Sequence, residues 1–456
     1  MKLLKVFYLI SIIFFFFSFC NAEEPPSQNQ PENSLLVRVT QPMEDMVTKT
    51  AHTAVEEVQA AAKEAHTLGK KFLQGLINIM IAASPGKTRV YLPAPSSDPN
   101  SGLTVGVLPV FLFVNKKEEI QHILAPSLTY NHTFGINSTM RHYWYPHKNA
   151  QMFIIASYAT ETNRRITFRY EDSQFLSEWF YFKCDLTVRR DGSFRFFGFG
   201  PRSEFKNQSN YTLKDNHFQI FTGINFLERL RLTLSNRYRL ANALDGPIHS
   251  LPSITTFSPR PEGVDIQKAV LAQRLTLSYD SRDLILAPTR GHLFNLFEEI
   301  AGPLGGDTKY DRMGLEARGF YPLKNNQWIT GWRFLVEGEN GSKTPFYEQS
   351  LLGGKDSLRG FGDARFIDRN KMNLTIEERI RVYTLSAFNV NVDFELTPYY
   401  DTGMVFHDPD NGRIWDLHHV GGLGFRTVVR PNVVGIIDLG FSEQGTALFV
   451  GIDYPF

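Results

Sequence analysis

The chain has 456 residues, with 48 Lys and Arg, 47 Asp and Glu, and a formal net charge of +1. This balance argues against a nucleic-acid partner, because nucleic-acid binding needs a concentration of positive charge. Aromatic residues make up 13% of the chain, including 38 Phe and 18 Tyr, which favours the aromatic girdles of a membrane barrel over a soluble enzyme.

The first 22 residues have the features of a secretory signal peptide. Two lysines precede an apolar core over residues 6–19, and Ala22 is a small residue of the kind that signal peptidase requires. A lipid anchor on Cys20 is an alternative, but the preceding Phe fits it poorly. Cleavage would leave Cys184 as the one cysteine, so we expect no intramolecular disulfide. No other run reaches about 18 apolar residues, so we expect no membrane-spanning helix.

Three segments separate the signal from the first predicted barrel strand. Residues 23–42 are rich in Glu, Pro, Gln and Asn and are predicted to be a disordered tail. Residues 43–84 carry apolar side chains at steps of three and four, which predicts an amphipathic helix that ends at Ser-Pro-Gly. Residues 85–101 are predicted to be a linker. The helix could pack in a small periplasmic domain, lie on the membrane or plug the barrel, and the sequence leaves these options open.

From residue 102 onward the chain consists of strand-like runs with no helical pattern between them, which predicts an antiparallel all-β fold. A single-chain bacterial outer-membrane barrel needs an even number of strands. We count 17 runs and therefore expect one before residue 190 to be wrong or merged, giving a 16-stranded transmembrane β-barrel over 102–456 with a short helical N-terminal extension. The runs are 102–114, 122–132, 134–145, 151–159, 164–172, 179–189, 208–225, 228–240, 268–280, 290–302, 309–322, 326–338, 371–382, 389–406, 415–428, 432–442 and 446–456.

Alternation within these runs separates a charged face from an apolar face. Glu377 and Arg379 share the polar parity of 371–382, and Glu395 shares that of 389–406. In a membrane barrel the apolar face meets lipid and the charged face lines the lumen. A soluble barrel would invert this arrangement, and periodicity by itself does not choose between them. The signal peptide, the aromatic content and the last strand favour the membrane.

The segment Leu-Gly-Gly-Lys-Asp-Ser-Leu-Arg-Gly-Phe at 352–361 lies within a long predicted loop, 340–370. Arg359 is permanently charged and needs an acceptor where water is scarce, and Asp401 has the parity of a lumenal carboxylate. A charge-assisted pair between them would hold the loop inside the barrel. The alternative is a Gly-rich extracellular hairpin in which Arg359 faces solvent and Asp401 is one of several lumenal acids.

These elements resemble the BamA/TamA-like family of outer-membrane barrels, the bacterial surface antigens. The loop is similar to the family signature L-G-G-x-x-x-(V/L)-R-G-F, and Tyr-Asp-Thr-Gly at 400–403 is similar to its aromatic-Asp-x-Gly element. Two further segments, 196–200 and 279–291, resemble the family's F-Y-G-I-G element and its Y-D-(T/S)-R-D…P-T-R-G hairpin. The resemblance covers about residues 100–456. It implies 16 strands and a lumenal loop latched by Arg359 and Asp401, with Gly360, Phe361 and Gly403 beside them.

The last predicted strand ends in an alternating apolar stripe. Leu448, Val450, Ile452, Tyr454 and Phe456 share one parity. The stripe is similar to the C-terminal signal by which outer-membrane barrels are recognised and inserted, so Tyr454 and Phe456 are predicted to engage the barrel-assembly machinery. The alternative is the closing strand of a soluble barrel.

The sequence contains no G-x-S-x-G, no H-E-x-x-H and no Gly-rich phosphate loop before a helix. We therefore expect no enzyme, no cofactor and no metal site. The resemblance implies that the protein inserts or translocates other molecules at the bacterial outer membrane, in contact with its lipid and with unfolded outer-membrane or exported proteins, or lipids, as cargo. Residues 23–100 show no strands of a POTRA domain, which weakens a role in recruiting such cargo. The alternatives are a structural or passive plugged barrel and, third, an enzyme using a lumenal acid.

Overall fold

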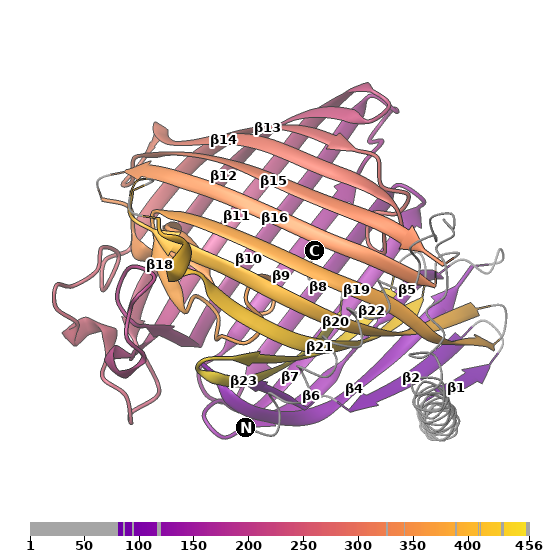
Figure 1. The fold of residues 1–456 in the computed structure, drawn as a ribbon, viewed down its shortest axis with the longest axis horizontal. Coiled ribbons are helices and arrows are strands. Elements are labelled where there is room, and N and C mark those ends of the chain that lie inside the picture. Colours follow the sequence, from indigo (N-terminus) through magenta and orange to yellow (C-terminus); the bar gives the residue numbers. More distant parts are fainter. Residues whose placement is uncertain are drawn as a thin grey trace, which may run out of the picture. The chain divides into compact units, whose positions relative to one another are not determined.

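The computed structural model describes residues 81–84, 87–93, 95–115, 120–324, 327–341, 343–387, 390–408, 410, 412–429 and 433–452. All of them belong to one compact unit, Gln74–Phe456. Within these residues the regular elements are antiparallel β-strands and short 3₁₀ helices (Figure 1). None of the described helices is long and apolar enough to cross a bilayer.

The elements follow one another as a meander of strands. In chain order they are β1 (Ile81–Ser84), β2 (Lys87–Pro93), β3 (Ser96–Asp98), β4 (Gly102–Val114), β5 (Ile120–Leu124), β6 (Ser127–Asn131), β7 (Gly135–His147), β8 (Ala150–Ala159), β9 (Arg164–Asp172), β10 (Phe180–Phe196), η1 (Phe205–Asn207), β11 (Ser209–Leu227), β12 (Leu230–Asp245), η2 (Ile254–Thr256), β13 (Lys268–Asp280), β14 (Gly291–Gly306), β15 (Tyr310–Leu323), β16 (Trp328–Gly341), η3 (Phe346–Glu348), β17 (Ser350–Leu352), β18 (Phe366–Asp368), β19 (Asn370–Ala387), β20 (Val390–Phe406), η5 (Ile414–Asp416), β21 (His418–Val429), β22 (Val433–Ser442) and β23 (Gly445–Ile452).

The strands close into a barrel of 18 strands, with β1 outside it. Strands β2 and β3 act as one interrupted strand because both pair with β4. Strands β5 and β6 likewise act as one, because both pair with β4 and with β7. From β7 to β23 each barrel strand pairs with the next one along the chain. The barrel closes between β23 and β3, where Leu448 is in register with Ser97.

The predicted antiparallel β-barrel is confirmed, but its count of 16 strands is wrong. Each of the 17 predicted runs coincides with a strand or with an interrupted strand of the barrel. The missing strand, β2 with β3, lies in 85–101, which was predicted to be a linker. Pro93 and Pro95 there lack a backbone donor, and such a strand is tolerated where its ladder is already interrupted. The helix predicted over 43–84 is also wrong at its end, because Ile81–Ser84 forms β1.

The remaining N-terminal predictions lie outside the described residues. They are the signal peptide at 1–22, the tail at 23–42 and the helix over 43–80.

Exposure shows which face of the barrel is polar. Glu377 and Arg379 on β19 are each 1% exposed, whereas Ile376, directly before them, and Leu296 on β14 are 41% and 58% exposed. The charged parity therefore faces inward and the apolar parity faces outward. A soluble barrel has the opposite arrangement, so this outer surface is suited to hydrocarbon.

The two rims of the barrel differ in their connections. One rim carries the long segments 197–208, 246–267, 342–369 and 407–417, and the other carries short turns such as 228–229. Long loops are extracellular and short turns periplasmic in barrels of this kind. The segment 342–369 packs inside the barrel, where Phe346 and Tyr347 join an apolar cluster with residues of β10, β11 and β12.

A charge placed on the outer face should destabilise the barrel. Leu296 is in register with Leu277 on β13 and Leu315 on β15, near the middle of these strands. We expect Leu296→Arg to lower the free energy of unfolding in lipid vesicles by about 2–4 kcal/mol, the cost of Arg at the bilayer mid-plane. Urea titration measures this value, and Leu296→Met is the matched control. A variant as stable as Leu296→Met would mean that this face does not meet lipid.

Candidate functional site: a buried ion cluster that holds the inner loop

Local backbone geometry gives the inner loop its shape before it meets the barrel wall. Strands β17 and β18 form a separate two-stranded hairpin. Gly353 and Gly354 follow β17 with φ values of 119° and 87°, which a Cβ would strain. The backbone N–H of Gly354 donates to the Phe361 carbonyl over 3.1 Å, and the Ser357 hydroxyl bonds the Gly353 backbone. These bonds close a compact turn that presents Arg359.

Arg359 is bound to Asp401 of β20 by both its side chain and its backbone. Its Nη2 lies 2.8 Å from Asp401 Oδ1, and its Nε lies 2.9 Å from Oδ2. The Arg359 backbone N–H also donates to Oδ2 over 3.1 Å. The guanidinium carbon lies 3.5 Å from the centre of the Tyr399 ring, which is a favourable position for a cation. Both members of the pair are 1% exposed or less.

The pair belongs to a larger cluster of buried charges of both signs. Arg359 Nη1 lies 3.2 Å from Glu377 of β19 and 3.4 Å from Asp438 of β22. Arg379 binds Glu377 over 2.7 Å, and Arg426 of β21 binds Asp438, with Nη2 3.1 Å from Oδ2. With Asp401, three guanidinium groups thus face three carboxylates. Mutual pairing offsets the cost of removing these charges from water.

Most of the predicted site residues meet in this cluster. Arg359, Asp401, Glu377 and Arg379 are in it, and Gly360 and Phe361 follow directly on the loop. Glu395 is buried on β20, in register with Arg426 and Arg381.

The sequence analysis missed three members of the cluster. They are Tyr399, Arg426 and Asp438. Arg426 and Asp438 carry the inward parity of their strands, and this was the available signal. Tyr454 and Phe456 lie outside the described residues.

Missing Cβ atoms let the loop approach the wall closely. A Cβ on Gly440 of β22 would lie 2.0 Å from the Arg359 carbonyl oxygen. A Cβ on Gly403 of β20 would lie 3.3 Å from Leu352 of β17. Phe361 then packs edge to face on Phe366, with ring centres 5.2 Å apart. The atom nearest to a Cβ on Gly403 would be the Met372 carbonyl oxygen of β19, at 2.7 Å.

A second anchor of opposite sign holds the start of the loop. Glu348 of η3 accepts hydrogen bonds from Arg237 over 2.9 Å and from Arg239 over 2.7 Å, both on β12. Arg312 of β15 donates to its backbone carbonyl. Burial would raise the pKa of Glu348, but Arg237 and Arg239 outweigh it and hold that pKa well below its usual range. The loop thus contributes the Glu348 carboxylate to β12 and the Arg359 guanidinium group to β19, β20 and β22.

The tip of the loop touches both sides of the seam between β23 and β3. The Ser442 hydroxyl, at the end of β22, donates to the Gly360 carbonyl over 2.8 Å. Arg365 Nε donates to Gln444, in the turn before β23, over 2.7 Å. On the other side Asn100, in the turn after β3, donates to the Asp363 carbonyl over 2.8 Å.

The site has no arrangement for metal chemistry. Among the described residues, no group of three or more His, Cys, Asp or Glu could hold a metal ion. The buried carboxylates of the cluster are all engaged by guanidinium groups. The geometry is that of a structural contact between the inner loop and the inward side chains of the barrel strands.

An antiparallel barrel with an apolar outer face, and with a loop bound in its polar interior, defines an integral membrane β-barrel protein. A sequence model of the Omp85 superfamily domain matches residues 148–415, more than half of the chain. The chain belongs to the Omp85 superfamily, and its resemblance to BamA/TamA-like barrels is confirmed.

Solved structures of similar proteins include two kinds of outer-membrane barrel. BamA from Haemophilus ducreyi lacking POTRA domains 1–3 is 15% identical, with a TM-score of 0.48 over 80% of this chain and 74% of that one. CdiB from Escherichia coli is 12% identical, with a TM-score of 0.43 over 82% of this chain and 62% of that one. CdiB from Acinetobacter baumannii is 10% identical, with a TM-score of 0.40 over 82% and 60%.

Removing either partner of the buried pair should be costly, and the two costs should not add. We expect Arg359→Gln and Asp401→Asn each to lower the free energy of unfolding by about 3–5 kcal/mol, because each leaves a buried charge unmatched. The double variant should be less destabilised than the sum of the two. Urea titration in detergent micelles measures all four proteins. Lys355→Gln, an exposed cation on the same loop, is the control, and strict additivity would contradict the pairing.

A methyl group at Gly440 should displace the loop. We expect Gly440→Ala to reduce hydrogen-exchange protection of the amides in 353–361, because its Cβ would collide with the Arg359 carbonyl. Gly435→Ala on the same strand is the matched control, since its Cβ would meet nothing nearer than 3.8 Å. Equal protection in the two variants would mean that the loop does not need this close approach.

Proposed function

We propose that this protein inserts or translocates polypeptides at the outer membrane, and that its anchored inner loop keeps the barrel closed at rest. The observation that carries the proposal is the position of the loop tip at the seam between β23 and β3. In the described residues this seam has a single register pair, Leu448 with Ser97. Other adjacent strands of the barrel, such as β14 and β15, stay in register along most of their length.

A seam whose two strands separate is where a barrel can accept another strand. Unpaired backbone N–H and C=O groups are costly in hydrocarbon, and a strand edge pairs readily with an added strand. An unfolded outer-membrane or exported protein supplies such a strand, and a lipid is the other cargo that the opened seam could pass. The proposed role is not enzymatic.

The loop is suited to control this seam because its tip reaches both sides. Gly360 and Arg365 contact the turn region before β23, and Asp363 contacts Asn100 beside β3. Release of Arg359 from its cluster would free these three contacts together. Export of the protein itself would use the signal at 1–22, and its own insertion would use Tyr454 and Phe456.

A passive plugged barrel is the second candidate. It is favoured by the number of charges that fasten the loop, with Glu348 held by Arg237 and Arg239 and Arg359 held by Asp401. A plug that never moves would have the same contacts. The two candidates differ in whether the seam has to open.

A disulfide across the seam should abolish activity if the proposal holds. Directly opposite strand residues lie close enough for a disulfide, so Ser97→Cys with Leu448→Cys, in a Cys184→Ser background, can lock it. In cells depleted of the wild-type protein, we expect the locked form to leave other outer-membrane barrels unassembled and a reductant to restore assembly. The readout is the amount of heat-modifiable barrel protein in the outer membrane.

The matched control is a lock between two fully paired strands. Leu296→Cys with Leu315→Cys joins β14 to β15 in the same background and should keep activity. Normal assembly of other barrels after depletion would support the passive barrel. Full activity of the locked seam would contradict the proposal that this seam opens.

A further inference from the structure

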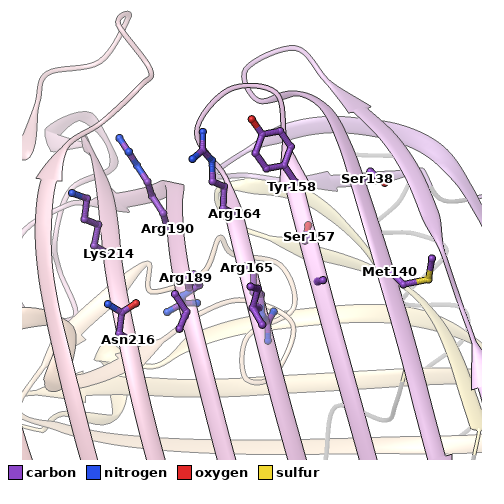
Figure 2. Close-up of a pocket in the computed structure, with 13 residues that line it drawn as sticks. Ser138, Met140, Ser157, Tyr158, Arg164, Arg165, Arg189, Arg190, Lys214 and Asn216 are labelled. Atoms are coloured by element: carbon purple, nitrogen blue, oxygen red, sulfur yellow. The ribbon is translucent and has the colours of Figure 1, made fainter.

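Three basic side chains form one row across the outer face of β9, β10 and β11. Arg190 on β10 is directly opposite Arg164 on β9 and Lys214 on β11. All three are exposed, and Figure 2 shows them on neighbouring strands. Within the part of the chain that the structure describes, none of the three is in an ion pair.

The row borders the apolar outer surface. Ile166 and Val188 occupy the next outward positions on β9 and β10, and they are 55% and 46% exposed. The residues of opposite parity face inward, as Arg189 does, where its Nη2 binds Asp215 over 2.8 Å. The three cations and these apolar side chains therefore lie on one continuous face.

The level of the row corresponds to a lipid head group. It lies at the rim that carries the long connections, next to the turn at 160–163, and this rim is extracellular. Outward positions on one strand are about 7 Å apart, so Arg164 and Arg190 lie about that far from Ile166 and Val188. The next outward position after Lys214 is Asn216. The Tyr158 ring is 4.9 Å from the Arg164 guanidinium carbon, and tyrosine is typical of the membrane interface.

Three like charges in register need an anion between them. Like charges directly opposite each other on a sheet are destabilising, and a cation beside lipid is costly without a partner. Acidic side chains supply partners for the inward cations of these strands, such as Asp215 for Arg189, but not for this row. A phosphate group fits, because Arg binds it through two parallel N–H bonds and Lys adds a point charge.

A groove of about 610 Å³ on this face is lined by the three cations together with Met140, Ile166 and Val188. The apolar side chains give the part of an acyl chain next to a head group a surface to lie against. A free phosphate would use the cations alone, whereas a lipid would use the apolar lining as well.

We propose that Arg164, Arg190 and Lys214 bind the phosphate groups of a lipid in the outer leaflet, whose acyl chains lie over Met140, Ile166 and Val188. This site is on the outside of the barrel, away from the inner loop and the seam. It is therefore independent of the function proposed above.

Native mass spectrometry of the full-length protein in detergent micelles tests the site. Lipid A and its dephosphorylated form are the two probes, and inorganic phosphate is the competitor. We expect wild-type protein to prefer phosphorylated lipid A, and phosphate at the same concentration not to displace it. The triple variant Arg164→Gln, Arg190→Gln, Lys214→Gln should bind lipid A about 100-fold more weakly, since each cation near an anionic membrane surface contributes about fivefold in affinity.

The matched control removes the same charge from exposed lysines in connections outside the row. Lys206→Gln, Lys309→Gln, Lys343→Gln should bind lipid A as the wild type does. Equal binding by the two triple variants, equal binding of both lipid forms, or displacement by inorganic phosphate would each overturn the proposal. Heat-modifiability on gels checks that the variants fold. If the variant Arg164→Gln, Arg190→Gln, Lys214→Gln does not fold, two measurements still test the proposal. They are the preference of the wild type between the two lipid forms and the lipid A affinity of Lys214→Gln.

Discussion

The buried pair between Arg359 and Asp401 is the contact on which the position of the inner loop depends. A buried ion pair is weak evidence of net stability, because well-packed apolar side chains are often as stabilising. Its effect is instead to select one position for the loop, since any other position leaves a charge unmatched. An apolar substitute is also less suited to this place, because the wall that receives Arg359 presents Glu377, Asp401 and Asp438.

The two anchors together fix the direction in which the loop crosses the barrel. Glu348 is received by arginines of β12 and β15, and Arg359 is received by carboxylates of β19, β20 and β22. An exchange of the two ends would bring like charges together on both walls. The opposite charges of Glu348 and Arg359 therefore fix the position of a segment that has little regular secondary structure. A substitution of Glu348 or Arg359 should therefore also displace the loop tip, where Gly360 and Arg365 contact residues beside the seam.

One alternation of side chains gives rise both to the inner cluster and to the outer face. Because successive residues of a strand point to opposite faces, strands such as β19 carry a charged inner row with Glu377 and Arg379 and an apolar outer row with Ile376. The inner row provides the groups that hold the loop. The row of Arg164, Arg190 and Lys214 is a departure from the apolar outer pattern, and such departures mark places where something other than hydrocarbon lies against the barrel.

The sequence by itself determined the antiparallel barrel and the separation of a charged face from an apolar face, and it made Arg359 and Asp401 candidates for a pair. Strand alternation is a local property, so 371–382 and 389–406 already separate Glu377 and Glu395 from their apolar neighbours. The charge of Arg359 needs an acceptor wherever water is scarce. Parity identified Asp401 as a candidate, and the resemblance to a known family connected the two.

Only the tertiary structure decided the number of strands and the full composition of the cluster. The strand at 87–98 was missed because its prolines and interruption remove the local pattern, and it exists through its pairing with β4. Arg426 and Asp438 look like any other inward charges in sequence. They enter the cluster because β19, β20, β21 and β22 pair in sequence, and their register places these inward residues beside Asp401 and Glu377. Strand pairing around a closed barrel is a non-local property, and a local pattern does not contain it.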